Sequence, residues 1–309
     1  MDPLTHTLVG VGMGNAFFRK RIGRAAIPIL AWASNLPDID AVVTLSGALN
    51  SILQRRTFGH SLFLIPIWSL VLTFILKRFY PTIRLPVLFG LVLLGAAVHL
   101  FFDLVNSFGV VLLWPFSDWR PELAMIFIID LILTGLLAAP LAISLIPSMR
   151  TSLERLSRIF VALAALYILF CGLNRSLAER ALSAEAHSSG KVDFSYVFPE
   201  PLGPLRWKGV LREGDHYQIY LIHSLSGEAQ KWGEVVTQTA DPRVEQTRKT
   251  PLARRIEWFF KAPVWVVEDP LPNQSTGVGV YDLRFNSIVF HRENPFVFHF
   301  TIDQKPDRP

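Results

Sequence analysis

The sequence is poor in cysteine and in charged residues. Its one cysteine, Cys171, lies inside an apolar run, which excludes an intrachain disulfide and a cysteine-rich zinc module. Only 18% of the 309 residues are charged, whereas 51% are hydrophobic and the mean hydropathy is +0.36. This composition excludes a disordered chain and is too apolar for an ordinary soluble domain, so it predicts a membrane protein.

The N-terminus lacks the charge pattern of a secretory signal peptide. Its positive residues follow the first apolar stretch instead of preceding it, and Asp2 is acidic. We therefore expect this segment to be retained in the mature protein.

The net charge of +5 is confined to the first part of the chain. Residues 1–173 contain 13 Lys and Arg against 8 Asp and Glu, whereas residues 174–309 contain 17 of each. A nucleic-acid-binding protein would concentrate positive charge on its soluble part. The distribution therefore predicts no nucleic-acid partner.

Long apolar runs predict an α-helical multi-pass membrane domain of five or six helices over residues 1–173. A bilayer crossing needs about 17–25 predominantly apolar residues. Five runs approach this length and a sixth is short and rich in glycine; in chain order the six are 4–18, 25–47, 60–76, 85–102, 122–146 and 159–173.

Lys and Arg are distributed unevenly between the loops that join these runs. Ten lie on one side of the predicted spans, and only Arg55, Arg56 and Arg120 lie on the other. Because positive residues favour the cytoplasm, we expect the N-terminus, residues 48–59 and 105–121, and everything after 174 to lie outside the cytoplasmic membrane of a bacterium.

The tail, residues 174–309, has the composition of a small, mainly antiparallel β domain of the α+β class. It begins with a polar segment expected to be helical, Asn174 to Gly190. Short runs of strand composition follow between Pro and Gly turns. They are 192–198, 205–211, 216–222, 264–268, 278–285 and 296–302, and a short amphipathic helix is expected at 252–260.

Six ionisable residues of the membrane half fall at one level of the predicted bilayer. Ionisable groups at membrane depth are costly unless they are paired or solvated, so each is a candidate functional residue. The predicted topology brings to the outer side all three histidines of this half and three of its carboxylates: His6, His60, His99, Asp38, Asp40 and Asp103.

Two local patterns strengthen the case for a site. His99 and Asp103 are four residues apart, which places them on one helix face within reach of a common cation. Pro37, in Asn35-Leu-Pro-Asp-Ile-Asp40, disfavours helix at the preceding residue. A broken helix at membrane depth is tolerated where it is buried in protein or faces water.

Each residue also has a purely structural interpretation. His6 could be a terminal surface residue, Asp103 could cap a helix end, and Asp38 could be an N-cap. His60, after Phe58-Gly59, could sit at the bilayer interface. These interpretations require six residues to gather on one side by accident.

Imidazole and carboxylate without thiolate suit zinc, with manganese or iron as alternatives, and the set could hold one to three ions. Asp118 and Asp130 are second-rank candidates on the same outer side. Asp118 could be a ligand, a helix-capping group or a solvated residue, and Asp130 could be a ligand or orient one. The histidines of the tail are scattered and receive no metal role: His187, His216, His223, His291 and His299.

Residues 1–145 resemble a family of bacterial inner-membrane proteins, the YdjM family, interpreted as metal-dependent hydrolases. The resemblance rests on five motifs in order: Thr5-His-Thr7, Asn35-Leu-Pro-Asp-Ile-Asp40, Arg56-Thr-Phe-Gly-His-Ser61, His99-Leu-Phe-Phe-Asp103 and Leu113-Trp-Pro-Phe-Ser117. The tail resembles the extra domain of longer members.

The order of these ligands is also similar to that of the zinc-dependent phospholipase C and P1 nuclease superfamily, helical phosphoesterases with three zinc ions. This resemblance implies ligands at His6, Asp38 or Asp40, His60, His99 and Asp103. That superfamily adds histidines and a glutamate after HxxxD, whereas no histidine occurs here between 99 and 187. Asp118, Glu122 or Asp130 would have to substitute, so a site of one or two metals is expected.

The leading functional hypothesis is a membrane-bound metal-dependent hydrolase. Asp38, Asp40 and Asp103 are its candidate catalytic carboxylates, as metal bridges or general bases. A membrane lipid or lipid-linked substrate with a phosphoester at the headgroup level fits the position of the site. The alternatives are a transporter or channel, and a metal-binding scaffold that anchors the β domain.

Overall fold

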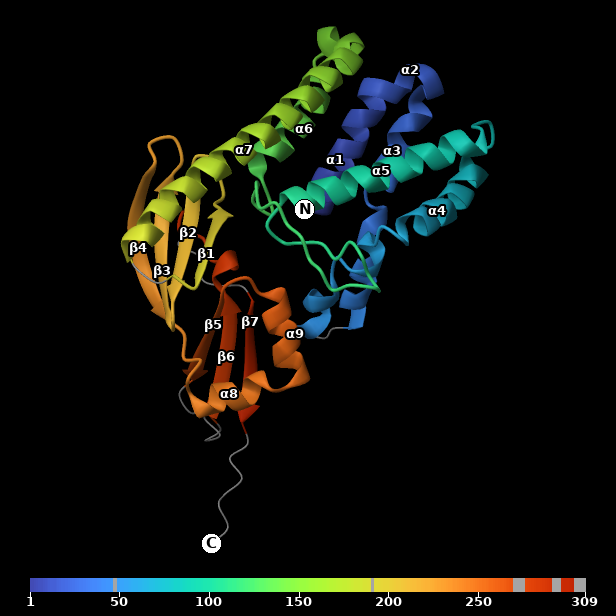
Figure 1. The fold of residues 1–309 in the computed structure, drawn as a ribbon. Coiled ribbons are helices and arrows are strands. Elements are labelled where there is room, and N and C mark those ends of the chain that lie inside the picture. The colour runs from blue at the N-terminus through green and yellow to red at the C-terminus, as the bar shows by residue number, and fades with distance from the viewer. Residues whose placement is uncertain (47–48, 190–191, 269–275, 291–295, 303–309) are drawn as a thin grey trace. The chain divides into compact units, whose positions relative to one another are not determined.

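The computed structural model describes residues 1–46, 49–189, 192–268, 276–290 and 296–302 (Figure 1). The chain forms two compact units. The first contains Met1–Gly47, Gln54–Leu173 and Pro201–Pro204, and the second contains Ala48–Leu53, Asn174–Glu200 and Leu205–Pro309. The first unit is helical, and the second carries the β-strands.

Close packing of two short helices begins the first unit. Helix α1 (Pro3–Met13) starts after Asp2, whose side chain accepts a hydrogen bond from the backbone N–H of Thr5. It packs against α3 (Ala26–Ala33). A Cβ atom added at Gly10 would lie 2.4 Å from the carbonyl oxygen of Leu30, so glycine allows this approach.

A π-helical turn, a short helix and a 3-10 turn connect α1 to α3. They are η1 (Gly14–Phe18), α2 (Arg19–Ile22) and η2 (Gly23–Ala25). After α3 the chain runs through 3-10 segments: η3 (Leu36–Ser46), η4 (Leu49–Gln54) and η5 (Phe58–His60). The expected break at Pro37 is therefore present.

Four longer helices follow: α4 (Ile65–Phe79), α5 (Leu85–Val105), α6 (Leu131–Ser144) and α7 (Leu153–Ser189), with the 3-10 turn η6 (Pro147–Ser152) before α7. Of these, α5 and Leu153–His187 of α7 are long and apolar enough to cross a membrane. Residues Ile52–His60 and α4 together make a third candidate, bent by 75°.

The described residues therefore contain two or three candidate spans, where the sequence predicted five or six. The run 25–47 becomes the eight residues of α3 and 3-10 turns, and 4–18 becomes an 11-residue helix with a π-helical turn. The run 122–146 is helical only from Leu131, and its 14-residue helix is short for a span. The residues on either side of each helix break are also apolar, so the apolar runs predicted longer helices than the chain forms.

Two antiparallel sheets form the core of the second unit. One has the order β1-β2-β3-β4 and the other β5-β6-β7. The strands are Phe194–Pro199 (β1), Arg206–Glu213 (β2), His216–His223 (β3), Glu228–Val236 (β4), Pro263–Glu268 (β5), Thr276–Asp282 (β6) and Val297–Ile302 (β7). The small antiparallel β region predicted for the tail is confirmed.

The six strands expected from the sequence are present, and one strand was missed. Strand β4 is polar and lies at the edge of its sheet with most of its side chains exposed, so it shows no alternation of apolar residues. The expected helix at 252–260 is α9 (Pro251–Phe259), which follows α8 (Pro242–Arg248). The 3-10 turn η7 (Leu283–Phe285) follows β6.

Buried side chains connect the elements of the second unit. Leu182, in the polar extension of α7, packs with Trp207 and Ile222 of the four-stranded sheet. The Tyr217 hydroxyl donates a hydrogen bond to the carbonyl of Pro263 at 3.0 Å, and the backbone N–H of Trp265 donates to Thr237 Oγ1 at 2.8 Å. The two sheets therefore share one folded unit.

Lys208 on β2 is a buried lysine and gives a testable pH dependence. Its Nζ contacts the carbonyl of Asn286 and lies 3.7 Å from Glu200 Oε1. Burial lowers the pKa of Lys208 below its ordinary value of 10.5. Between the lowered pKa and 10.5 the unfolded chain binds a proton that the folded chain does not, so stability rises with pH across this window.

We expect Lys208→Met to destabilise the sheet unit by about 3 kcal/mol, because it leaves the buried Glu200 without its cation. Lys208→Met should also abolish the rise of stability at alkaline pH, because the titrating group is gone. Adding Glu200→Gln should recover part of the lost stability, because no buried carboxylate is then left without its cation. Hydrogen exchange of the β2 amides in the full chain measures both effects. Additive losses, or an unchanged pH slope in the double variant, would contradict the pairing.

Candidate metal centre

Three buried side chains of the first unit converge at the end of α5. His60 Nε2 lies 3.1 Å from His99 Nε2 and 3.1 Å from Asp103 Oδ2, and His99 Nε2 lies 3.4 Å from the same oxygen. All three residues are essentially inaccessible to solvent. His60, His99 and Asp103 form a group that could hold a metal ion. We call it the buried triad.

The outer partners of the two histidines determine which ring nitrogens face each other. His99 Nδ1 lies 2.7 Å from the carbonyl oxygen of Ser34, which can only accept, so Nδ1 carries the hydrogen. His60 Nδ1 lies 2.9 Å from Asp40 Oδ2 and donates to that carboxylate. In the neutral rings, both Nε2 atoms then direct lone pairs toward each other. A cation or a proton between them is required.

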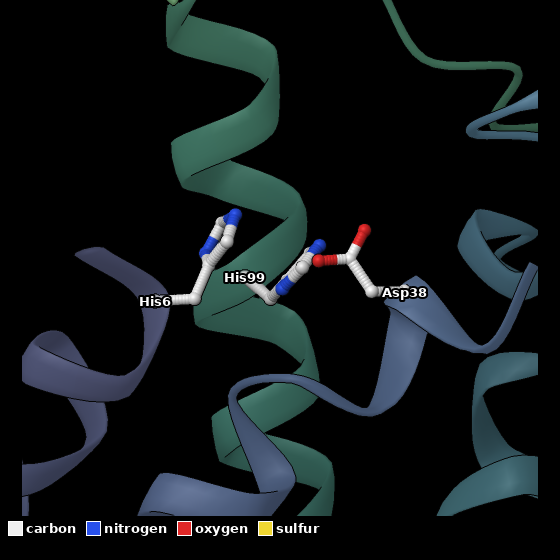
Figure 2. Close-up of side chains that lie close together, drawn as sticks. All are labelled: His6, Asp38 and His99. Carbon is white, nitrogen blue, oxygen red and sulfur yellow. The ribbon is translucent and has the colours of Figure 1, made fainter. Parts of the chain in front are cut away.

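A second group shares His99 with the buried triad. His6 from α1, Asp38 from η3 and His99 from α5 also place ligand atoms close together, and we call this group the open triad because Asp38 is partly exposed. Figure 2 shows the three side chains in front of α5, with the His99 ring between His6 and Asp38. The His6 and His99 rings stack with centroids 3.6 Å apart.

The 3-10 segments bring Asp40 and His60 together. Asp40 Oδ2 accepts a hydrogen bond from the backbone N–H of Thr57 at 2.9 Å in addition to the one from His60. A Cβ at Gly59 would lie 2.1 Å from the carbonyl oxygen of Pro37. Only glycine allows the two segments to approach this closely, and that approach fixes the His60 ring. Asp40 therefore orients a candidate ligand instead of joining either triad.

Arg56 is a buried part of the site that the sequence did not single out. Its Nε lies 2.8 Å from Asp103 Oδ2, its Nη1 donates to Asn106 Oδ1 at 3.0 Å, and its guanidinium lies 4.5 Å from the centre of the Phe108 ring. A signal was available in the charge pattern, because Arg55 and Arg56 are two of only three positive residues on the predicted outer side.

Asp103 is the residue on which most of these contacts converge. Besides Arg56 and the two histidines of the buried triad, His6 Nε2 lies 3.2 Å from Asp103 Oδ1. The amino group of Met1 also contacts Oδ1, and Asn106 Nδ2 donates to it at 3.3 Å. Asp103 thus links both triads and the loop that follows α5.

Two buried carboxylate oxygens at the site have no hydrogen bond to the described residues. Asp38 Oδ2 and Asp40 Oδ1 are of this kind. The Arg55 side chain lies near both carboxylates, with Nη2 3.3 Å from Asp38 Oδ1 and Nε 3.9 Å from Asp40 Oδ1. A cation near Asp38 would give its second oxygen a partner.

The second-rank candidates lie in neither triad. Asp130 caps α6, where its side chain accepts hydrogen bonds from the backbone N–H of Leu133 and from the Tyr167 hydroxyl, both at 2.8 Å. Asp118 is exposed. Among the tail histidines, His187, His216, His223 and His299 are in neither triad, and His291 lies outside the described residues.

Gly59→Ala tests the close approach that positions His60. We expect a loss of about 1–3 kcal/mol, because the new methyl group would force η3 and η5 apart, together with weaker zinc binding. Thermal unfolding in detergent, with and without zinc, measures both. The matched control is Gly90→Ala on α5, where an added Cβ meets nothing within 4 Å. Equal behaviour of the two variants would contradict this role of Gly59.

The residues of both triads lie in the part of the chain that matches a known protein family. Residues 1–178, more than half of the chain, match the family described as YdjM inner membrane protein. The chain is also 32% identical over 139 residues to the uncharacterized protein YfhP of Bacillus subtilis (strain 168). This match covers 42% of each protein, so it spans about two fifths of the relative's length.

No solved structure matches the chain. The family match contains all six residues that the sequence predicted as ligands and both triads of the structure. The chain therefore belongs to the YdjM family of inner membrane proteins, and its helical unit carries a buried His/Asp cluster that could bind a metal ion.

Proposed function

We propose that this protein is a membrane-bound metal-dependent hydrolase that cleaves a phosphoester or related bond of a lipid-linked substrate at the outer face of the cytoplasmic membrane. One observation carries the proposal. Two buried imidazoles direct Nε2 atoms at each other across 3.1 Å, with a carboxylate oxygen completing the triangle.

The buried triad has the dimensions of one face of a tetrahedral zinc site. Two ligands, each about 2.0–2.1 Å from zinc and about 109° apart, are separated by about 3.3 Å. The three edges of the buried triad measure 3.1, 3.1 and 3.4 Å. The donors are imidazole nitrogen and carboxylate oxygen, which zinc accepts and which also suit manganese or iron. Zinc is the ion we propose.

Because both triads use His99, we expect a single ion, held by one triad at a time. His99 Nδ1 is occupied by the carbonyl of Ser34, so this ring has one nitrogen left to offer. The buried and open triads therefore compete for the same lone pair. We place the ion on the buried triad, where the donors are closest, with His6 and Asp38 beside it.

Asp38 is the best-placed general base. A bound zinc ion supplies a water that is acidic enough to react at neutral pH. Asp38 is the partly exposed carboxylate of the site, and its Oδ2 is free of hydrogen bonds to the described residues. We propose that this oxygen accepts a proton from the attacking water, because Asp103 and Asp40 are almost completely buried.

Arg55 provides a positive charge for an anionic substrate. Its side chain is 30% exposed and lies beside Asp38, so a phosphate group that approaches Asp38 meets the guanidinium. The distribution of Lys and Arg supports an outer position for this end of the site, because positive loops favour the cytoplasm. A bond at the level of lipid headgroups suits a site at the end of a membrane helix.

Hydrolysis tests the proposal directly. Full-length protein, purified without chelators, is assayed for release of phosphate or headgroup from a panel of phospholipids and polyprenyl phosphates. We expect Asp38→Asn to lower kcat by about 10²–10⁴-fold, the range for a positioned acid or base, while zinc stays bound. Glu154→Gln is the control, because Glu154 pairs with Arg158 away from both triads.

Metal without turnover on any substrate would favour a metal-binding scaffold. Ion flux through the purified protein would favour a channel or transporter. Absence of bound metal in the wild-type protein would contradict the hydrolase.

A further inference from the structure

A partly enclosed cavity of about 360 Å³ lies between four helices of the first unit. Helices α1, α5, α6 and α7 all contribute to its wall, and every lining side chain is apolar. Its floor is buried, with Val9, Ala164 and Ile168 each exposing 5% of their surface or less. Its rim is open, since Phe101 is 49% and Leu169 is 64% exposed.

The cavity and the metal centre share two helices, α1 and α5. On α1, Val9 and Met13 line it and follow His6 by three and seven residues, about 4.5 and 10 Å along the helix axis. On α5, Val98 and Phe102 line it and directly precede His99 and Asp103. The wall of the cavity therefore begins within one turn of His6 along α1 and, on α5, is made by residues next to His99 and Asp103 in the sequence.

We propose that this cavity binds one hydrocarbon chain of the lipid substrate while the headgroup lies at the open triad. This inference rests on the proposed function, which supplies the hydrolysis reaction at the headgroup. It adds a binding site for the chain, made by α1, α5, α6 and α7, and assigns the substrate to lipids whose acyl or prenyl chain starts next to the reacting bond.

The chemistry of the lining selects a hydrocarbon occupant. A polar ligand would lose its hydrogen bonds to water without gaining others, at a cost of about 1–3 kcal/mol for each group. The volume lies within the range of about 300–1,000 Å³ for small-molecule sites. The rim belongs to α5 and α7, the two helices long enough to span a membrane, so lipid chains are available beside it.

The test uses labelling that requires no metal and no turnover. Full-length protein is reconstituted in vesicles of phosphatidylcholine and phosphatidylglycerol that contain a trace of phosphatidylglycerol with a diazirine in one acyl chain. After irradiation, labelled residues are located by mass spectrometry. We expect label on Val161 and Leu169, which line the cavity, to exceed label on Leu166, which is exposed on the same helix but is not part of the lining.

Two alanines of α7 provide a matched pair of variants. Ala165 lines the cavity and Ala162 does not, and both are exposed, so a larger side chain can be accommodated at either position. Ala165→Phe should reduce labelling of the cavity residues at least fivefold, whereas Ala162→Phe should leave it unchanged. Zinc content should equal that of the wild type in both variants.

The outcomes separate the chain site from the hydrolase. Label spread evenly over the exposed face of wild-type α7, or cavity labelling that Ala165→Phe leaves intact, would overturn the chain site whatever the enzyme does. Cavity labelling in a protein that binds no metal would support the binding site for the hydrocarbon chain and contradict the proposed hydrolase function. The distribution of label over α7 in the wild type shows whether the cavity binds a hydrocarbon chain, even if Ala165→Phe does not fold.

Discussion

His99→Ala should abolish metal binding, because His99 belongs to both triads. We expect the affinity for zinc to fall by more than about 100-fold, beyond the loss typical for a residue that only orients a ligand. His60→Ala should behave almost as severely, since His60 is 3.1 Å from both other donors of the buried triad. His6→Ala should be milder, because His6 lies only in the open triad.

Elemental analysis and zinc titration of the purified variants measure this order. His187→Ala is the matched control, since this exposed histidine bonds only to the carbonyl of Ser183 among the contacts described and lies in neither triad. If His6→Ala lost the metal while His60→Ala kept it, the ion would belong to the open triad. Full zinc in His99→Ala would exclude both triads.

Arg56→Met should strongly destabilise the metal-free protein. The substitution removes the guanidinium that pairs with Asp103 at 2.8 Å and leaves that buried carboxylate with the histidine rings, Asn106 and the Met1 amino group. Removing one partner of a buried ion pair typically costs about 3–5 kcal/mol. With zinc bound to Asp103, the ion replaces part of the lost positive charge, so the loss should be smaller.

Arg55→Met is the control for the neighbouring position. Arg55 is partly exposed and its ion pair with Asp38 is longer, at 3.3 Å, so a change within about 1 kcal/mol is expected. Thermal unfolding in detergent, measured with and without zinc, compares the variants. A loss from Arg56→Met that zinc leaves unchanged would show that Asp103 does not contact the ion.

The sequence predicted the parts of the site that depend on local spacing. His99 and Asp103 lie one turn apart on α5, as their i, i+4 spacing implies, and the chain breaks at Pro37 as expected. The contacts of Arg56 with Asp103 and of Asp40 with His60 join segments brought together by loop folding. The contact of Asp40 with His60 depends on the close approach at Gly59, which residue spacing alone does not reveal.

The same limit explains the difference in the helices. Hydropathy located α5 and the apolar part of α7, because these runs have no internal break. It overestimated the crossings elsewhere, because Pro37 and the helix start at Asp130 interrupt runs that remain apolar on both sides. In the tail, strand composition between Pro and Gly turns found six strands and missed the polar, exposed edge strand β4.

X-ray absorption at the metal edge is the most direct test of the proposed ion. For wild-type protein purified without chelators, we predict zinc with nitrogen and oxygen ligands at about 2.0–2.1 Å and the outer scattering typical of imidazole. The spectrum should disappear in His99→Ala together with the metal. A wild-type protein without metal, or a metal with sulfur in its coordination shell, would contradict a centre built from His60, His99 and Asp103.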